Sequence, residues 1–150
     1  MPELFIHKSV DVNASASTLW NVLTDNAFIP QYMFNCNAET DWKPGSPLLW
    51  RGAADGKVYV KGHIVTFNAP HLLEYTVIDP NSAIADIPEN YLTMTFAIKD
   101  RGANTCTLDI KQGDYAKVEN GQQRHADTVG GNDMWLESVK KVAENAMISA

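Results

Sequence analysis

Hydrophobic and polar positions alternate at the start of the chain and then change to helical spacing. In residues 4–13, Ile6, Val10 and Val12 fall on one side, a period of two that predicts a strand. Residues 15–25 follow a helical pattern, and Ser15 is a candidate N-cap. Pro30 limits this region to short helices, so we expect two in succession with a break near residues 25–26.

The middle of the chain has the alternation and the turn signals of an antiparallel sheet. We expect strands at residues 48–53, 58–67, 72–78, 91–99 and 105–112. Asp55-Gly56 is a strong hairpin signal, because both positions tolerate positive φ. Several of these strands exceed the common length of about five or six residues, and long antiparallel strands twist and coil. The pattern therefore predicts a curved sheet with a concave face.

A helical pattern over residues 122–147 closes the chain. Its apolar stripe consists of Trp135, Val139, Val142, Ala143 and Ala146. We expect this long helix to fill the concave face of the sheet. Gly130-Gly131 would cost on the order of 1 kcal/mol per glycine in a free helix. This pair indicates either a kink or separate helix start capped by Asn132, or a close approach of the sheet or a ligand to the helix backbone.

Length and composition predict a single domain over residues 1–150, with a core large enough to need no disulfide or metal. The net charge of −6 disfavours nucleic acid as a partner, because it repels phosphate backbones. No apolar run approaches the ~20 residues of a membrane span, and residues 1–10 lack a signal-peptide core. We therefore expect a cytoplasmic protein, with Cys36 and Cys106 as buried free thiols.

Several stretches resemble one known superfamily. The first stretch is Val10-Asp11-Val12-Asn13-Ala14 together with residues 19–25, and the second is Gly62-His63-Ile64-Val65 together with residues 70–76. The third is Leu108-Asp109-Ile110-Lys111-Gln112 before Tyr115, and the fourth runs from Asn132 through Trp135 and Leu136 to Val139 and Val142. Together they resemble the START-like (SRPBCC) superfamily. The branch they are most similar to holds bacterial proteins like the C-terminal domain of the activator of heat-shock-protein-90 ATPase.

The resemblance implies an α+β helix-grip fold. This fold has a curved seven-stranded antiparallel sheet, two short helices and a long C-terminal helix across a cavity. Members of the superfamily bind lipids, sterols, polyketides or other apolar molecules, and some cyclise or dehydrate polyketides. The eukaryotic activator stimulates a chaperone, but it carries an additional N-terminal domain that this sequence lacks, so a chaperone contact is the less expected role. No cofactor is implied.

Strand parity and the family pattern together select the residues that face the long helix. Aromatic side chains and methionines suit a pocket for planar or apolar ligands, although the same residues would also form an ordinary packed core. Gln112 and Lys8 follow the inward parity too, so each must reach the cavity mouth, a protein partner or a ligand. The candidate lining residues are Trp50, Tyr75, Met94, Phe96, Gln112, His125, Met134 and Trp135. Among them, Gln112, Tyr75 and His125 are candidates to orient a polar ligand end.

Signatures of catalysis are scarce in the sequence. It has no nucleophile elbow, phosphate-binding loop, dinucleotide fingerprint or zinc-protease motif. The four histidines, His7, His63, His71 and His125, show no ligand spacing, so we expect no metal site. Carboxylate pairs such as Glu39 with Asp41 are typical of solvated turns.

Three functions follow from these observations. The first is a carrier or sensor that binds an unidentified small apolar or aromatic molecule between sheet and helix. The second is an enzyme on the same scaffold, such as a polyketide cyclase or dehydratase, which needs two or more polar groups converging in the cavity. The third is a chaperone-interacting protein, which needs an exposed apolar patch. We expect binding rather than catalysis, and a homodimer is left open.

Overall fold

The computed structural model describes residues 3–129 and 131–149. Within them, seven strands form one antiparallel sheet in the order β1-β7-β6-β5-β4-β3-β2. The strands are β1 (Ile6–Val12), β2 (Cys36–Glu39), β3 (Pro47–Gly52), β4 (Val58–Asn68), β5 (Leu72–Val77), β6 (Leu92–Gly102) and β7 (Thr105–Gly113). The helices are α1 (Ala16–Thr24), α2 (Gly121–Val129) and α3 (Gly131–Ser149), and the short 3₁₀ helices are η1 (Ile29–Gln31), η2 (Pro88–Asn90) and η3 (Tyr115–Lys117).

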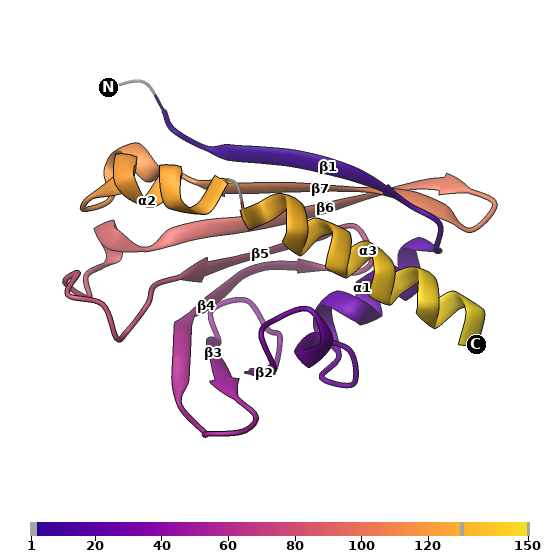
Figure 1. The fold of residues 1–150 in the computed structure, drawn as a ribbon, viewed down its shortest axis with the longest axis horizontal. Helices are drawn as coiled ribbons and strands as arrows, with labels where there is room; N and C mark the ends of the chain where they lie inside the picture. Colours follow the sequence, from indigo (N-terminus) through magenta and orange to yellow (C-terminus); the bar gives the residue numbers. More distant parts are fainter. Residues whose placement is uncertain (1–2, 130, 150) are drawn as a thin grey trace.

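The sheet is covered on one face by α3, which crosses the strands diagonally (Figure 1). This arrangement is the helix-grip fold that the sequence predicted. The five strands expected in the middle of the chain are β3 to β7, and their bounds agree with the prediction to within three residues. No helix among the described residues combines the length and the apolar character needed to cross a bilayer.

The first helical region forms as its caps predict. The side-chain oxygen of Ser15 accepts a hydrogen bond from the backbone N–H of Thr18, which satisfies one of the free donors at the start of α1. The helix ends at Thr24, and η1 follows with Pro30 in its first turn. The expectation of two short helices in succession is confirmed.

The C-terminal helical region is divided into two helices. Helix α2 ends at Val129 and α3 begins at Gly131, and Gly130 lies outside the described residues. The side chain of Asn132, the predicted cap, lies outside the described residues. Figure 1 shows α2 over the end of the sheet where β7 finishes, with α3 continuing across the sheet toward α1.

Two apolar clusters hold the layers together. The larger one lies between the inner face of the sheet and helices α1 and α3, with Leu19, Leu108 and Val139 all 0% exposed. The smaller one contains Ile6, Leu92, Tyr115 and Val118. Burial of each such side chain stabilises the fold by about 1.5–3 kcal/mol before conformational entropy is subtracted.

Strand β2 is the one strand that the sequence pattern did not predict. It is only four residues long, and its inward residues are the small Cys36 and Ala38. The side chain of Asn26 supports it, since its amide donates to the carbonyl of Ala38 and accepts from the N–H of Ala38, both at 2.8 Å. Strand β2 is thus held at the sheet edge by its pairing with β3 and by a side chain outside the strand.

Candidate functional site: a cavity between the sheet and the C-terminal helices

A cavity of about 200 Å³ lies between the inner face of the sheet and the two C-terminal helices. Five strands, from β3 to β7, supply most of its wall. Thr128 of α2 and Trp135 of α3 line it from the helical side, and the segment after η1 reaches it from a third side. Its lining residues are Met33, Phe34, Trp50, Val60, Tyr75, Val77, Met94, Gln112, Thr128 and Trp135.

Strand register places the central lining residues in one row across the sheet. Tyr75 of β5 lies directly opposite Met94 of β6, and Met94 lies opposite Gln112 of β7. Side chains of directly paired residues point to the same face. The three side chains therefore form a continuous floor, and Trp50 extends it through its pairing with Val60.

A connected set of aromatic rings lies in this floor and behind it. The ring centroids of Trp50 and Tyr75 are 5.8 Å apart, those of Tyr75 and Phe96 are 5.6 Å apart, and those of Phe96 and Trp135 are 5.6 Å apart. Tyr32 meets the ring of Trp135 edge-on at 5.8 Å. This connected set gives the wall a large apolar area with fixed geometry.

The polar atoms of the wall have few protein partners. The indole Nε1 of Trp50 is buried and has no hydrogen-bond partner. The indole Nε1 of Trp135 donates to the Sδ of Met33 at 3.3 Å, and a thioether sulfur is a weak acceptor. Burial raises the pKa of Tyr75 and of Tyr32 well above the usual value for tyrosine. Both phenols are therefore neutral hydrogen-bonding groups at physiological pH.

The structure brings together five of the eight residues that the sequence put forward. Trp50, Tyr75, Met94, Gln112 and Trp135 all line the cavity. A sixth, Phe96, is 1% exposed and packs between the rings of Tyr75 and Trp135, so it supports the wall without lining the cavity.

The remaining two residues lie elsewhere. Met134 is 77% exposed, so its predicted place in the lining is wrong. The helical stripe that carries Trp135 turns the preceding residue outward. His125 of α2 packs edge-on against Tyr115 at 5.4 Å, and its Nε2 lies 3.3 Å from the carbonyl oxygen of Phe5. His125 therefore packs against Tyr115 of the smaller apolar cluster and does not line the cavity.

Five lining residues were not among those candidates: Met33, Phe34, Val60, Val77 and Thr128. Val77 shares the parity of Tyr75, so strand alternation contained a signal for it. Met33 and Phe34 follow η1, and Phe34 has a positive φ of 52°. No periodic pattern in the sequence indicates how such a segment turns toward the sheet.

Lys8, the other inward polar residue, reaches a protein partner. Its Nζ donates to the carbonyl oxygen of Val129, the last residue of α2, at 2.6 Å. A cation at the C-terminus of a helix also meets the negative end of the helix dipole. The position of Lys8 is thus explained by the end of α2, without a ligand.

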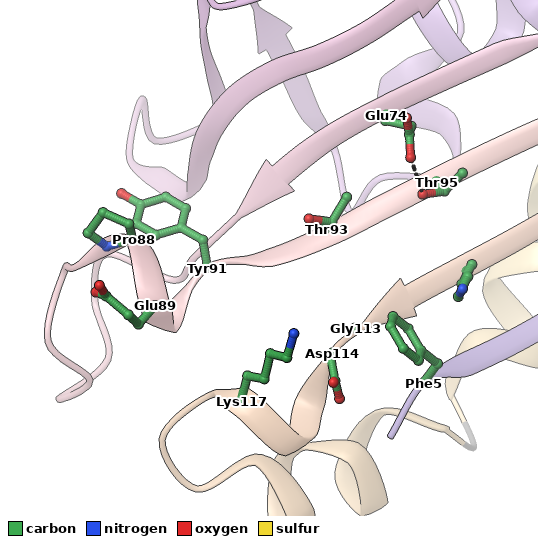
Figure 2. A pocket seen from close by; sticks show the side chains of 11 residues that line it. Phe5, Glu74, Pro88, Glu89, Tyr91, Thr93, Thr95, Gly113, Asp114 and Lys117 are labelled. Atoms are coloured by element: carbon green, nitrogen blue, oxygen red, sulfur yellow. Dashed lines mark hydrogen bonds between the residues drawn. The ribbon is translucent and has the colours of Figure 1, made fainter. Parts of the chain in front are cut away.

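A larger hollow of about 520 Å³ lies on the opposite face of the sheet (Figure 2). Thr93, Thr95 and Lys111 line it, and they alternate with the cavity residues along β6 and β7. The carboxylate of Glu74 accepts a hydrogen bond from the hydroxyl of Thr95 at 2.9 Å. The Nζ of Lys111 lies 4.3 Å from the ring centroid of Phe5. Figure 2 shows the labelled acidic and basic side chains, among them Glu89 and Lys117, spread around an open rim. Its charged side chains suit water better than an apolar molecule.

Metal-ligating groups do not gather within the described part of the chain. No three His, Cys, Asp or Glu residues there lie close enough to hold a metal ion. Cys36 and Cys106 are both buried free thiols, as the sequence predicted. Burial raises the pKa of each thiol.

Comparison with known proteins identifies relatives over nearly the whole chain. Residues 13–144 match the family model described as Activator of Hsp90 ATPase homolog 1-like protein. The search of proteins of curated function gave no significant match.

Solved structures give the same fold. The solution structure of ChR145 from Cytophaga hutchinsonii is 29% identical, with a TM-score of 0.76 and complete coverage of both chains. The Aha1 dimer from Colwellia psychrerythraea is 13% identical, with a TM-score of 0.71 over 94% of this chain and 96% of the other. An HSP90 activator from Plasmodium falciparum is 15% identical, with a TM-score of 0.62 over 83% and 86%. The last two likenesses concern the fold alone.

Proposed function

Because the chain belongs to the family of Activator of Hsp90 ATPase homolog 1-like proteins, we propose that it binds one small apolar or aromatic molecule in the cavity. The helix-grip fold of this family commonly binds hydrophobic ligands. The observation that carries the proposal is the row Tyr75, Met94 and Gln112, which Trp50 extends along the sheet and Trp135 faces from α3, around a volume of about 200 Å³.

The size and chemistry of the cavity define the class of ligand. An engineered apolar cavity of about 150 Å³ stays dry and accepts benzene, so this volume suits a molecule of one or two rings. The lining is made of aromatic, aliphatic, thioether and neutral polar side chains. Methionines such as Met33 and Met94 adapt their shape to a ligand more readily than branched residues do.

A thermal-shift titration with naphthalene tests this function. A ligand at one hundred times its dissociation constant stabilises a protein by about 2.7 kcal/mol, which raises Tm by several degrees. The variant Val60→Trp fills the cavity from β4 and should abolish the shift. Val65→Trp is its matched control on the same strand, because Val65 is 42% exposed and lies outside the lining. Naphthalene stabilisation that survives Val60→Trp, or no stabilisation of the native protein, would contradict the proposal.

The wall supports binding better than acid–base catalysis. Tyr75 is the titratable side chain among the described lining residues, and burial raises its pKa. It therefore keeps its proton at neutral pH and serves as a hydrogen-bond donor rather than a base. A cyclase or dehydratase-like activity remains the alternative, and turnover of an aromatic polyketide that is lost in Tyr75→Phe would favour it.

A chaperone contact is the second candidate function. The family description refers to Hsp90 ATPase activation, and two large apolar side chains, Phe34 and Met134, are 86% and 77% exposed. A contiguous exposed apolar patch marks a protein-binding surface, whereas apolar side chains exposed singly are ordinary, so this function requires Phe34 and Met134 to contact the same partner. If this function holds, the protein should stimulate ATP hydrolysis by a purified Hsp90, and Phe34→Ser with Met134→Ser should remove the effect. An unchanged ATPase rate at saturating protein would reject it.

A further inference from the structure

We propose that the ligand is an uncharged molecule with an acceptor oxygen, such as a ketone or an ether, and that the indole N–H of Trp50 binds this oxygen. The inference rests on the proposed function, because it takes the cavity as the binding site. It goes further by assigning a polar recognition element to a wall that is otherwise apolar.

The unpaired donor on Trp50 is the central observation. Trp50 is 2% exposed, and its Nε1 is the one buried side-chain polar atom without a hydrogen-bond partner in the described part of the chain. Buried polar groups are almost always hydrogen-bonded, because losing water without a replacement costs free energy. An unpaired donor in the wall of a cavity is therefore explained when the occupant of the cavity supplies the acceptor.

Other polar groups of the wall are also available to a ligand. Trp135 donates only to the Sδ of Met33, an acceptor that an oxygen would readily replace. Within the described residues, neither the hydroxyl of Tyr75 nor the amide of Gln112 forms a hydrogen bond to another protein group. The wall thus offers at least three N–H or O–H donors around one small volume, and an acceptor on the ligand complements them.

The charge of the lining residues indicates whether the acceptor oxygen of the ligand is neutral or ionised. The described lining residues carry no ionised side chain, and the raised pKa of Tyr75 keeps that phenol neutral. A carboxylate would lose its hydration in this wall and gain no cation to replace it. A carbonyl or ether oxygen needs only the hydrogen bonds that the wall provides.

The donor becomes accessible by a local rearrangement. The Nε1 of Trp50 has less than 1 Å² of accessible surface, so a neighbouring side chain must move before a ligand reaches it. Met33 and Met94 are the flexible side chains of the lining, and each has several rotatable bonds. We expect a change of rotamer at one of them, rather than a movement of the sheet, to open this path.

Three probes of nearly the same shape test the proposal. They are 2-acetylnaphthalene, 2-isopropenylnaphthalene, which replaces the C=O by C=CH₂, and 2-naphthoate, which replaces the ketone by a carboxylate. Dissociation constants from calorimetry with the native protein should favour the ketone over the alkene by about five- to tenfold, the effect expected for one hydrogen bond. The carboxylate should bind more weakly than the ketone.

The variant Trp50→Phe keeps an aromatic ring and removes the donor. It should abolish the preference for the ketone while leaving the affinity for the alkene within about twofold. Trp42→Phe is the matched control, because Trp42 packs against Phe67 outside the cavity lining. It should leave the preference intact. If Trp50→Phe fails to fold, the indole ¹H–¹⁵N signal of Trp50 in the native protein replaces it and should move downfield with the ketone relative to the alkene.

The outcomes separate this inference from the proposed function. Equal affinity for ketone and alkene, a preference that survives Trp50→Phe, or tightest binding of naphthoate would overturn the inference and leave apolar binding intact. Failure of all three probes to bind would overturn the binding function and this inference together.

Discussion

The Nζ of Lys8 donates a 2.6 Å hydrogen bond to the carbonyl oxygen of Val129, joining the middle of β1 to the last residue of α2. The next residue toward the N-terminus, Thr128, lines the cavity. The same contact that satisfies an inward lysine therefore holds the end of α2 over the site.

Replacement of Lys8 tests this role. Lys8→Met keeps the side-chain length and removes the ammonium, so it should lower the free energy of unfolding by about 1–2 kcal/mol. Hydrogen exchange should become faster in α2 and remain unchanged in β6 and β7. Lys99→Met, at an exposed position, is the control and should change neither quantity. Unaltered exchange in α2 of the Lys8 variant would contradict this assignment.

Two methionines that the sequence treated alike should respond differently to truncation. Met94 lines the cavity, whereas Met134 is 77% exposed. Met94→Ala enlarges the cavity and removes packing, so we expect a loss of about 2 kcal/mol in urea unfolding. Met134→Ala should stay within about 0.5 kcal/mol of the native protein. A larger loss for Met134→Ala than for Met94→Ala would show that the two positions are wrongly placed.

Alkaline pH should destabilise the protein through its buried phenols. The pKa of Tyr32 and of Tyr75 is raised in the folded protein, mainly by burial. The folded state therefore holds these protons more tightly than the unfolded state does. The stabilisation from the two protonated phenols is fully present below the pKa of tyrosine in the unfolded chain, about 10, and is lost as the pH rises further. Urea midpoints measured from pH 8 to pH 11 should fall, and the double variant Tyr32→Phe, Tyr75→Phe should fall less steeply. If the urea midpoint of the double variant fell with pH as steeply as that of the native protein, this explanation would be contradicted.

Acid pH should act on the contact between α3 and the turn that follows β1. Glu144 accepts from the Nζ of Lys140 at 2.7 Å and from the backbone N–H of Asn13 at 2.9 Å, and these bonds lower its pKa from 4.5. The stabilisation is present above the unfolded pKa and is lost as the pH falls through the lower folded value. Glu144→Gln should reduce stability by about 1 kcal/mol at pH 7. The difference from the native protein should shrink below about pH 4, and a constant difference down to pH 2 would argue against this linkage.

Individual residues show which parts of the structure could be predicted from the sequence. The alternation in residues 91–99 and 105–112 predicted β6 and β7, because one face of each strand must be apolar to meet the core. The same alternation placed Tyr75, Met94 and Gln112 on the inner face, which the register confirms. The local sequence pattern was sufficient to predict a strand wherever one face of that strand is buried against the core.

Other features depend on contacts between distant segments. Strand β2 is held by Asn26, and Met33 reaches the cavity through a turn that has no periodicity. The unpaired Nε1 of Trp50 was equally unpredictable, since a missing partner is a property of the folded surroundings rather than of the residue. Met134 differs from Trp135 by one helical position, a rotation of about 100° that a sequence pattern with uncertain helix bounds does not resolve.

The most direct test of the account is an NMR titration of the four tryptophan indoles with naphthalene. Trp50 and Trp135 line the cavity, whereas Trp20 and Trp42 pack against Phe67 in the core. If the cavity binds an aromatic molecule, the indole signals of Trp50 and Trp135 should shift and saturate together, with those of Trp20 and Trp42 almost unchanged. Four unchanged signals, or shifts confined to Trp20 and Trp42, would contradict the assignment of the cavity as the binding site.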